Sequence, residues 1–310
     1  MADIKELVAK KCILVIFGPT ASGKTDLSIK LAKKLGSQII SCDSQQVYHE
    51  LFIGTARPTK EEMKGVKHYL IGHVSVTEEY NVARYIEDFA AVADTIFSLG
   101  KLPIVAGGTN MWLSSLLDGL SPAPPKDDAV RKNLEDFVSK NGPQKLHSQL
   151  IAIDQESALK IKPTDTKRIV RAMEMYLVSG KTRTELFKEK VFLPYTFIPV
   201  AITRPIEEIY DRINARVDKM VEAGLLDEVK GLVEKGLEDD VRRIKAHGYP
   251  ALLDWAHGVV TLEEALETMR MDTRHYAKRQ MTFIRSRSDF TVFENAEKEM
   301  ILQLLEDYDG

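Results

Sequence analysis

The chain has 310 residues, 44% of them hydrophobic and 29% charged, a balance typical of a globular protein with a substantial core. Its formal net charge of −3 gives no overall attraction to nucleic acid, so any such binding must depend on local basic clusters. The two cysteines, Cys12 and Cys42, lie in separate apolar runs, which argues against a disulfide framework or a zinc site. Because no apolar run has membrane-spanning length, we expect a cytoplasmic protein without membrane contact.

Strands and helices alternate over the first hundred residues. Residues 12–17 are apolar and rich in β-branched side chains, which predicts a buried parallel strand. Shorter apolar runs predict strands at 38–42 and 103–106, and apolar residues at helical spacing predict a helix over 81–99. A further helix is expected after the first strand, ending at Gly36. This order predicts an α/β fold with a parallel sheet.

A helical insertion interrupts this pattern. The proline-rich segment 121–125 ends the alternation of strands and helices. Residues 127–190 are helical in pattern and charged, without a strand signal. An apolar run at 195–202 predicts a return to the sheet, and Thr261 with Glu264 forms a capping box that predicts the start of a long helix. The expected domains are a catalytic core made of residues 1–122 and 195–310, and a helical insertion of residues 123–194.

A phosphate-binding motif, G-x-x-x-x-G-K-T, follows the first predicted strand. Its residues are Gly18, Pro19, Thr20, Ala21, Ser22, Gly23, Lys24 and Thr25. The glycines let the backbone wrap around phosphate oxygens, while backbone amides and the start of the next helix point at the anion. Lys24 adds a positive charge, and the Thr25 hydroxyl is placed to coordinate Mg²⁺. The alternative is a glycine-rich turn without a ligand. Its position between a predicted strand and a predicted helix predicts a P-loop NTPase-like parallel sheet, the fold of many nucleotide-binding and ATP-binding proteins.

Two other strand ends are expected at the same rim of the sheet. Asp43 follows the second strand, where it is either a ligand of Mg²⁺ or a general base, or else merely a turn-capping residue. Gly107, Gly108 and Thr109 follow the third strand, as a ligand contact or as a plain turn. The acidic residue that many P-loop nucleotidases place there is missing, which argues against ordinary nucleotide hydrolysis.

Basic residues gather in two places. Such clusters attract phosphate backbones, although a charge run is also typical of a solvated helix face. Arg274, Lys278 and Arg285 recur on one helical face, which favours nucleic-acid binding there. The first cluster holds Lys167, Arg168, Arg171, Lys181 and Arg183, and the second holds Arg270, Arg274, Lys278, Arg279, Arg285 and Arg287.

With these motifs in order, the sequence resembles the bacterial-type tRNA dimethylallyltransferases, also called isopentenyl-diphosphate transferases. The resemblance extends over nearly the whole chain, and the terminal T-R-x-Y-A-K-R-Q pattern is its most specific part. The matching stretches are 18–25, 43–48, 53–59, 107–109, 119–122, 166–172, 179–181, 212–218, 247–249 and 273–280.

This resemblance implies transfer of a dimethylallyl group from dimethylallyl diphosphate to N6 of the adenosine beside the tRNA anticodon. Mg²⁺ held by Thr25 and a target adenine that leaves its stack suit this reaction. We also expect the enzyme to be a monomer. The catalytic residues implied are Asp43, Lys24, Thr25, Thr109 and Arg216. The tRNA anticodon arm is expected to contact Asp43, Ser44, Gln45, Gln46, Thr109, Arg131, Lys167, Arg168, Ile169, Val170, Arg171, His247, Gly248, Tyr249, Arg274, Lys278, Arg279 and Gln280.

The sequence departs from the family pattern in two places. The segment from His68 to His73 lacks the usual His-Asp combination, and His247 stands where the family often has Ile. Three other functions stay open: a small-molecule P-loop kinase, an adenylate isopentenyltransferase, and a non-catalytic RNA-binding protein. The intact Lys24-Thr25 pair argues against the last of these.

Overall fold

The computed structural model describes residues 4–295 and 297–308, and the chain divides into two compact units. The first unit extends to Ser115 and resumes at Pro194, and the second is Leu116–Leu193. The second unit starts earlier than the insertion expected at residue 123. Leu120 and Val191 exchange two backbone hydrogen bonds of 2.9 Å, which attach this stretch of chain to the second unit.

The first unit is built on a six-stranded, wholly parallel sheet, which confirms the predicted α/β fold. Two of its strands were not predicted, because one has only two residues and the other is largely exposed. The sheet order is β3 (His68–Tyr69), β2 (Ile39–Cys42), β4 (Ile104–Gly107), β1 (Cys12–Phe17), β5 (Thr196–Thr203) and β6 (Thr291–Glu294).

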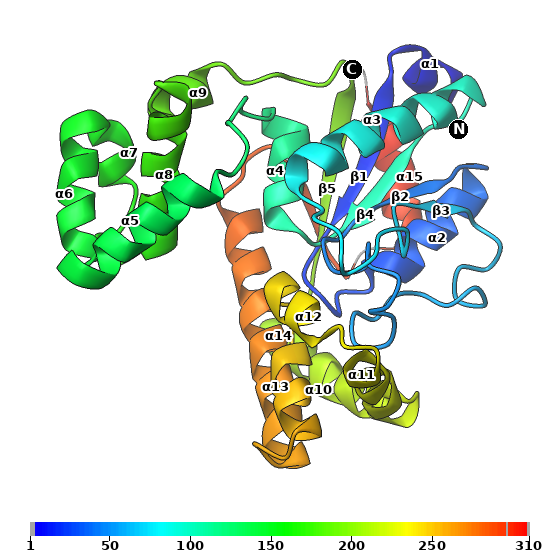
Figure 1. Ribbon diagram of the computed structural model, residues 1–310. Coiled ribbons are helices and arrows are strands. Elements are labelled where there is room, and N and C mark those ends of the chain that lie inside the picture. The colour runs from blue at the N-terminus through cyan, green and yellow to red at the C-terminus, as the bar shows by residue number, and fades with distance from the viewer. Residues whose placement is uncertain (1–3, 296, 309–310) are drawn as a thin grey trace. The chain divides into compact units, whose positions relative to one another are not determined.

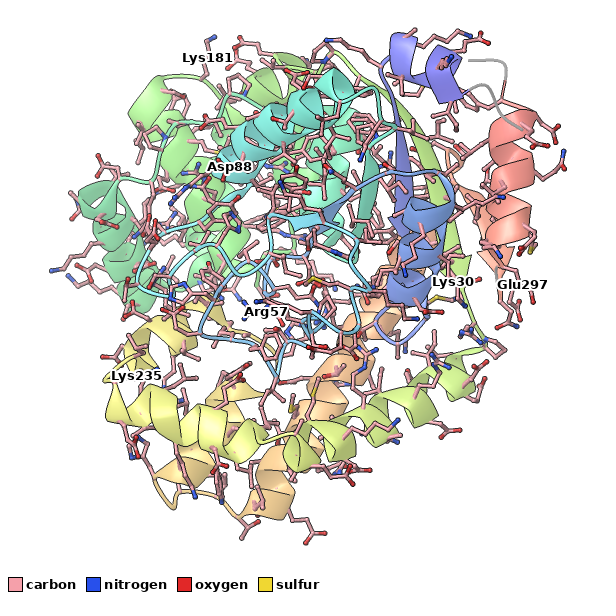
Figure 2. The ribbon with its side chains drawn as sticks, turned by 90° about the vertical axis from the view of Figure 1, so that its right-hand side faces the viewer. Lys30, Arg57, Asp88, Lys181, Lys235 and Glu297 are labelled. Atoms are coloured by element: carbon pink, nitrogen blue, oxygen red, sulfur yellow. The ribbon has the colours of Figure 1, made fainter. Side chains whose placement is uncertain are left out.

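One face of the sheet is covered by α1 (Ile4–Ala9), α2 (Lys24–Lys34) and α15 (Lys298–Glu306). Alternate strand residues such as Leu14 and Ile16 point into this layer, as the two-residue period of a strand requires. Figure 2 labels Lys30 on α2 and Glu297 before α15 on neighbouring parts of the surface, in keeping with the packing of these two helices.

The other face carries α3 (Val82–Ser98), and α4 (Asn110–Asp118) packs beside it. The Asn81 side chain caps α3 by accepting the N–H groups of Ala83 and Arg84. Phe89 of α3 lies 6.3 Å, between ring centroids, from Phe197 of β5. This packing buries the apolar face that the sequence predicts.

The sheet is followed by a helical arm, α10 (Ile206–Glu222), α11 (Leu225–Glu234), α12 (Glu238–Ile244), α13 (Tyr249–Ala256) and α14 (Leu262–Arg285). Helix α14 packs against both α10 and α13, as Figure 1 shows in yellow-green to orange. Both hydrogen bonds of the predicted capping box at Thr261 and Glu264 are present. The arm returns the chain to β6 at the edge of the sheet.

The second unit consists of α5 (Asp128–Asn141), α6 (Pro143–Ile153), α7 (Gln155–Leu159), α8 (Thr166–Ser179) and α9 (Arg183–Lys188), drawn in green in Figure 1. Its core contains Leu134, Leu150, Ile169 and Met173. Within residues 4–295 and 297–308, every helix is too short or too polar to cross a lipid bilayer.

Candidate active site

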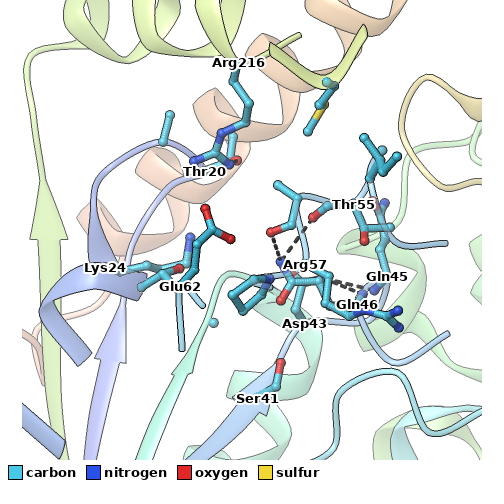
Figure 3. A pocket seen from close by; sticks show the side chains of 18 of the residues that line it. Thr20, Lys24, Ser41, Asp43, Gln45, Gln46, Thr55, Arg57, Glu62 and Arg216 are labelled. Carbon is cyan, nitrogen blue, oxygen red and sulfur yellow. Dashed lines mark hydrogen bonds between the residues drawn. The ribbon is translucent and has the colours of Figure 1, made fainter. Parts of the chain in front are cut away.

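A cavity of about 740 Å³ opens at the carboxyl ends of β1, β2 and β4, where ligands of open parallel sheets bind. The P-loop and Asp43 line it from the sheet, and Arg216 and Met269 line it from the helical arm. All of these residues belong to the first unit. Figure 3 shows Lys24 and Arg216 on one side of this pocket, with Asp43, Gln45 and Gln46 on the other.

The P-loop joins β1 directly to α2, as the motif predicts. Gly23 caps the helix with φ +94°, and Ala21 also has a positive φ of 65°. A Cβ atom on Gly18 would lie 2.5 Å from the carbonyl oxygen of Ile202, so only glycine fits there. The loop therefore has the tightly wound backbone that directs amide groups at an anion.

Three arginines surround the P-loop, and they differ in what they contact. Arg204 Nε donates to the carbonyl of Ser22 at 2.8 Å, and Arg212 Nε donates to the carbonyl of Ala21 at 2.7 Å. The Arg216 guanidinium reaches the Thr20 hydroxyl at 3.3 Å. Arg204 and Arg212 hold the loop backbone. Arg212 and Arg216 both line the cavity, and Figure 3 shows the Arg216 guanidinium pointing into it.

Lys24 lies in the wall of the cavity with its ammonium 3.2 Å from the carbonyl oxygen of Pro19. Burial lowers the pKa of Lys24 to about 8, and the charge of Asp43 opposes part of that shift. Burial also lowers the pKa of Arg216, with the charge of Arg212 acting in the same direction. Two cations held together in a partly dry cavity form a site that a bound anion stabilises.

Asp43 occupies the opposite wall, directly after β2. Its Oδ1 accepts the backbone N–H groups of Gln45 at 2.9 Å and Gln46 at 3.2 Å. These bonds fix the orientation of the carboxylate and leave Oδ2 for a ligand. Thr109 lies beside it, where its hydroxyl accepts the backbone N–H of Ser44 at 2.9 Å.

Side chains of α14 and of the segment before α13 complete this end of the cavity. Gln280 is 1% exposed, accepts the Thr20 N–H at 2.9 Å and donates to the carbonyl of Gly108 at 2.6 Å. Gln45 Nε2 lies 2.7 Å from Nδ1 of His247, and the His247 ring packs edge-on against Tyr276. Burial lowers the pKa of His247, which favours the neutral ring that accepts this bond.

Sequence reasoning missed several residues that shape the cavity. Gln46 Nε2 donates to the carbonyls of Thr55 and Ala56, which places the 53–59 stretch in the cavity wall. Arg57 donates to the carbonyls of Tyr48 and His49. The 53–59 stretch was singled out only by resemblance, because nothing in its local pattern indicates a ligand.

The residues expected to bind tRNA occupy different environments. In the second unit, Lys167 and Arg168 are exposed on α8, whereas Ile169 and Val170 lie in the core. In the first unit, Lys278 and Arg279 are exposed on α14. Tyr249 is fully buried, and Gly248, with φ +82°, caps α13. The exposed side chains of both helices remain predicted tRNA contacts.

Three arginines of the expected tRNA site hold acidic or amide partners. Glu174 is fully buried and accepts both Arg131 and Arg171 at 2.7 Å, together with the N–H of Asp127 at 3.0 Å. Arg274 pairs with Glu267 at 2.6 Å and Asn214 at 2.9 Å. A buried carboxylate needs such partners, so Arg131 and Arg171 also stabilise the second unit.

The cavity offers oxygen ligands that suit Mg²⁺. Thr25 and Asp43 both line it, and Mg²⁺ in phosphate-binding sites takes one or two protein oxygens together with phosphate oxygens and water. Over the described part of the chain there is no group of three or more His, Cys, Asp or Glu residues able to hold a metal by themselves. The donor set fits a magnesium ion that shares its ligands with a bound diphosphate.

Comparison with curated proteins identifies relatives that match most of the chain. The tRNA dimethylallyltransferase of Acetivibrio thermocellus is 45% identical over 276 residues, which cover 88% of each chain. That of Halalkalibacterium halodurans is 38% identical over 300 residues, which cover 96% of this chain and 95% of the relative.

Solved structures similar to this chain carry descriptions of the same kind as the curated relatives. The tRNA isopentenylpyrophosphate transferase of Bacillus halodurans is 37% identical, with a TM-score of 0.69 over 96% of this chain and 95% of the other. A eukaryotic dimethylallyltransferase acting on tRNA is 28% identical, with a TM-score of 0.75 over 93% of this chain and 75% of the other. The model of the IPP transferase family matches residues 46–287. The chain belongs to the IPP transferase family.

Proposed function

We propose that this protein is a tRNA dimethylallyltransferase, which transfers the dimethylallyl group of dimethylallyl diphosphate to N6 of adenosine 37, next to the anticodon. One observation carries the proposal: a P-loop with two cations faces the oriented carboxylate of Asp43 across a single cavity, which Glu62 also lines. The first wall suits a departing diphosphate, and the second suits a nucleophilic amine. The relatives named above are described as tRNA dimethylallyltransferases, which supports the proposal.

The diphosphate binds along the P-loop wall. Negative charge grows on the leaving diphosphate as the allylic C–O bond breaks, and fixed cations there favour the transition state. Lys24 and Arg216 supply these cations, and backbone amides of the P-loop supply hydrogen bonds. Thr25 would hold Mg²⁺, which neutralises further charge on the diphosphate when bound.

Asp43 acts on the amine. The N6 nitrogen forms a bond to the allylic carbon, and Asp43 Oδ2 accepts the proton that N6 loses. Because Oδ1 is held by the two backbone N–H groups of Gln45 and Gln46, the carboxylate is oriented before the substrate arrives. Thr109 supports Asp43 from beside it, because its hydroxyl accepts the backbone N–H of Ser44, the next residue.

The tRNA is held by exposed cations. Lys278 and Arg279 of α14 follow Tyr276, which reaches the carbonyl of Gly108 at the rim of the cavity, so they lie near the place where a flipped base would enter. Lys167 and Arg168 of α8 would hold another part of the anticodon arm. Both walls of the cavity come from one chain, which supports a monomeric enzyme, and its tRNA substrate supports a cytoplasmic location.

The decisive experiment supplies labelled dimethylallyl diphosphate and Mg²⁺ with either unmodified tRNA or AMP. We expect label in tRNA and release of pyrophosphate. Label in AMP alone would identify an adenylate isopentenyltransferase. A separate reaction supplies ATP and Mg²⁺ alone. Slow ATP hydrolysis there, with no prenyl transfer in the first reactions, would identify a kinase instead. Mass spectrometry of the digested tRNA locates the modified adenosine.

A further inference from the structure

The segment between β2 and β3, residues 43–67, has neither helix nor paired sheet strand, yet it forms much of the cavity wall. Long irregular segments of this kind in compact domains are commonly functional and need anchoring. The central part of this one is anchored from the helical arm by one carboxylate, Glu228 of α11.

The Glu228 carboxylate accepts four hydrogen bonds. Oε2 accepts the backbone N–H groups of Phe52 at 3.0 Å and Ile53 at 2.7 Å. Oε1 accepts the N–H of Gly54 at 3.2 Å and the hydroxyl of Tyr249 at 2.6 Å. Three successive amides directed at one carboxylate fix the backbone of the loop, because charge-assisted bonds are stronger than neutral ones.

The Tyr249 ring adds a steric contact to the same anchor. A Cβ atom on Gly54 would lie 2.7 Å from both Cζ and the hydroxyl oxygen of Tyr249, which is fully buried. Burial and the neighbouring Glu228 charge raise the pKa of Tyr249, so its hydroxyl stays protonated and donates. Loop and arm therefore fit together in only one arrangement at this point.

The anchored loop in turn positions the amine side of the cavity. Thr55 and Ala56, the next two residues, present their carbonyls to Gln46 Nε2 at 3.1 and 3.2 Å. The backbone N–H of Gln46 then donates to Asp43 Oδ1. A continuous path of hydrogen bonds and short backbone links thus runs from α11 to Asp43.

We propose that Glu228 is a positioning residue for the transfer step, acting with Tyr249 to hold loop 52–56 and, through Gln46, the carboxylate of Asp43. Glu228 contacts no reacting atom in this proposal, and it rests on the proposed function of Asp43 as the base. A displacement of about 1 Å at a catalytic group can cost about a hundredfold in rate, which is enough for a remote anchor to govern turnover.

The test measures the rate constant of a single turnover with tRNA and labelled dimethylallyl diphosphate for Glu228→Gln, Tyr249→Phe and Gly54→Ala. We expect Glu228→Gln to slow it about thirtyfold, because the amide nitrogen of Gln cannot accept an N–H. Tyr249→Phe, which keeps the ring, should slow it about threefold. Asp227→Asn, an exposed neighbour on the same helix, is the matched control and should leave it unchanged.

The amplitude of the same turnover counts competent enzyme molecules, so it separates positioning from folding. An unchanged rate constant in Glu228→Gln, with or without a lower amplitude, would overturn the proposal. If that variant folds poorly, Tyr249→Phe and Gly54→Ala decide the question on the same criterion. Wild-type protein that transfers no label at all would instead count against the proposed function itself.

Discussion

The two walls of the cavity are built on opposite principles. The P-loop wall is cationic, and its backbone is one run of consecutive residues whose carbonyls accept bonds from Arg204 and Arg212. The Asp43 wall carries a single oriented carboxylate and depends on partners far away in the sequence, such as Glu228 and His247. Under the proposed function, the P-loop wall stabilises the leaving group and the Asp43 wall activates the amine.

The strongest way to break this comparison is to disable the amine wall alone. Replacing Asp43 by Asn keeps the size of the side chain but removes its basicity, so we expect the single-turnover rate to fall by about a hundredfold or more. Binding of tRNA, measured by fluorescence anisotropy, should change little. Parallel loss of binding and rate would remove the case for Asp43 as a base.

Disabling the phosphate wall should instead affect the diphosphate substrate. Lys24→Met removes the cation but keeps most of the stem, and we expect kcat/KM for dimethylallyl diphosphate to fall roughly thirtyfold. Competition by inorganic pyrophosphate should weaken along with it, while tRNA affinity stays close to that of the wild type. A normal inhibition constant for pyrophosphate would show that Lys24 does not contact the leaving group.

Acid–base behaviour sharpens the same distinction. Because the pKa of Lys24 is lowered to about 8, the residue is charged below that pH and neutral above it in the free protein. Pyrophosphate binds the charged form, so we expect its affinity to lose up to about tenfold per pH unit above 8 on account of this group. Calorimetry from pH 7 to 10 measures pyrophosphate affinity for the wild type and for Lys24→Met. The part of the affinity loss that is due to Lys24 should be absent in the variant.

The neighbouring arginines give a paired test within the phosphate wall. Arg216 faces the cavity, so Arg216→Lys should lower kcat/KM about tenfold through the loss of guanidinium geometry. Arg212 also lines the cavity, but its Nε is already bonded to the Ala21 carbonyl, so for Arg212→Lys we expect only about a threefold effect. Steady-state kinetics of both variants at saturating tRNA measures the difference, and a reversed order would assign the diphosphate contact to Arg212.

The smallest expected effect lies outside both walls. Lys278 is exposed on α14, and Lys278→Glu should weaken tRNA binding and reduce the slope of log affinity against log salt by about 1 to 2. Lys235, an exposed lysine after α11, is the control position, and Lys235→Glu should leave the slope unchanged. Equal slopes in the Lys278 variant and the wild type would make the basic face of α14 a solvated surface only.

The two walls also differ in how far they could be predicted. The P-loop, its strand and its helix follow from local pattern, since every residue needed is adjacent in the chain. The long-range contacts of both walls do not follow from local pattern: the partners of Thr20 in the P-loop and of Phe52 near Asp43 lie 260 and 176 residues away, and no periodicity connects such pairs. Gln280 was grouped with the tRNA contacts of α14, although its spacing of four from Tyr276 puts both on the face that the structure turns towards Gly108.

In the second unit, the position of one acidic residue in the sequence predicts a salt bridge. Glu174 stands among Val170 and Met173 on the apolar face of α8, and a carboxylate in that place must find cationic partners. Arg131 and Arg171 are those partners. A pattern of charge within an apolar helical face thus predicts a salt bridge before it predicts a binding site.

The backbone bridge between Leu120 and Val191 ties together the two segments through which the chain enters and leaves the second unit. An insertion whose two ends lie close together can be replaced by another without disturbing the parent domain. The parent domain then has only a short distance to bridge, and the entropic cost of closing that loop is small. The helical unit can therefore vary in length or surface charge between proteins without disturbing the sheet. Under the proposed function, the surface that binds tRNA on this unit is free to diverge while the residues at the P-loop and Asp43 are kept.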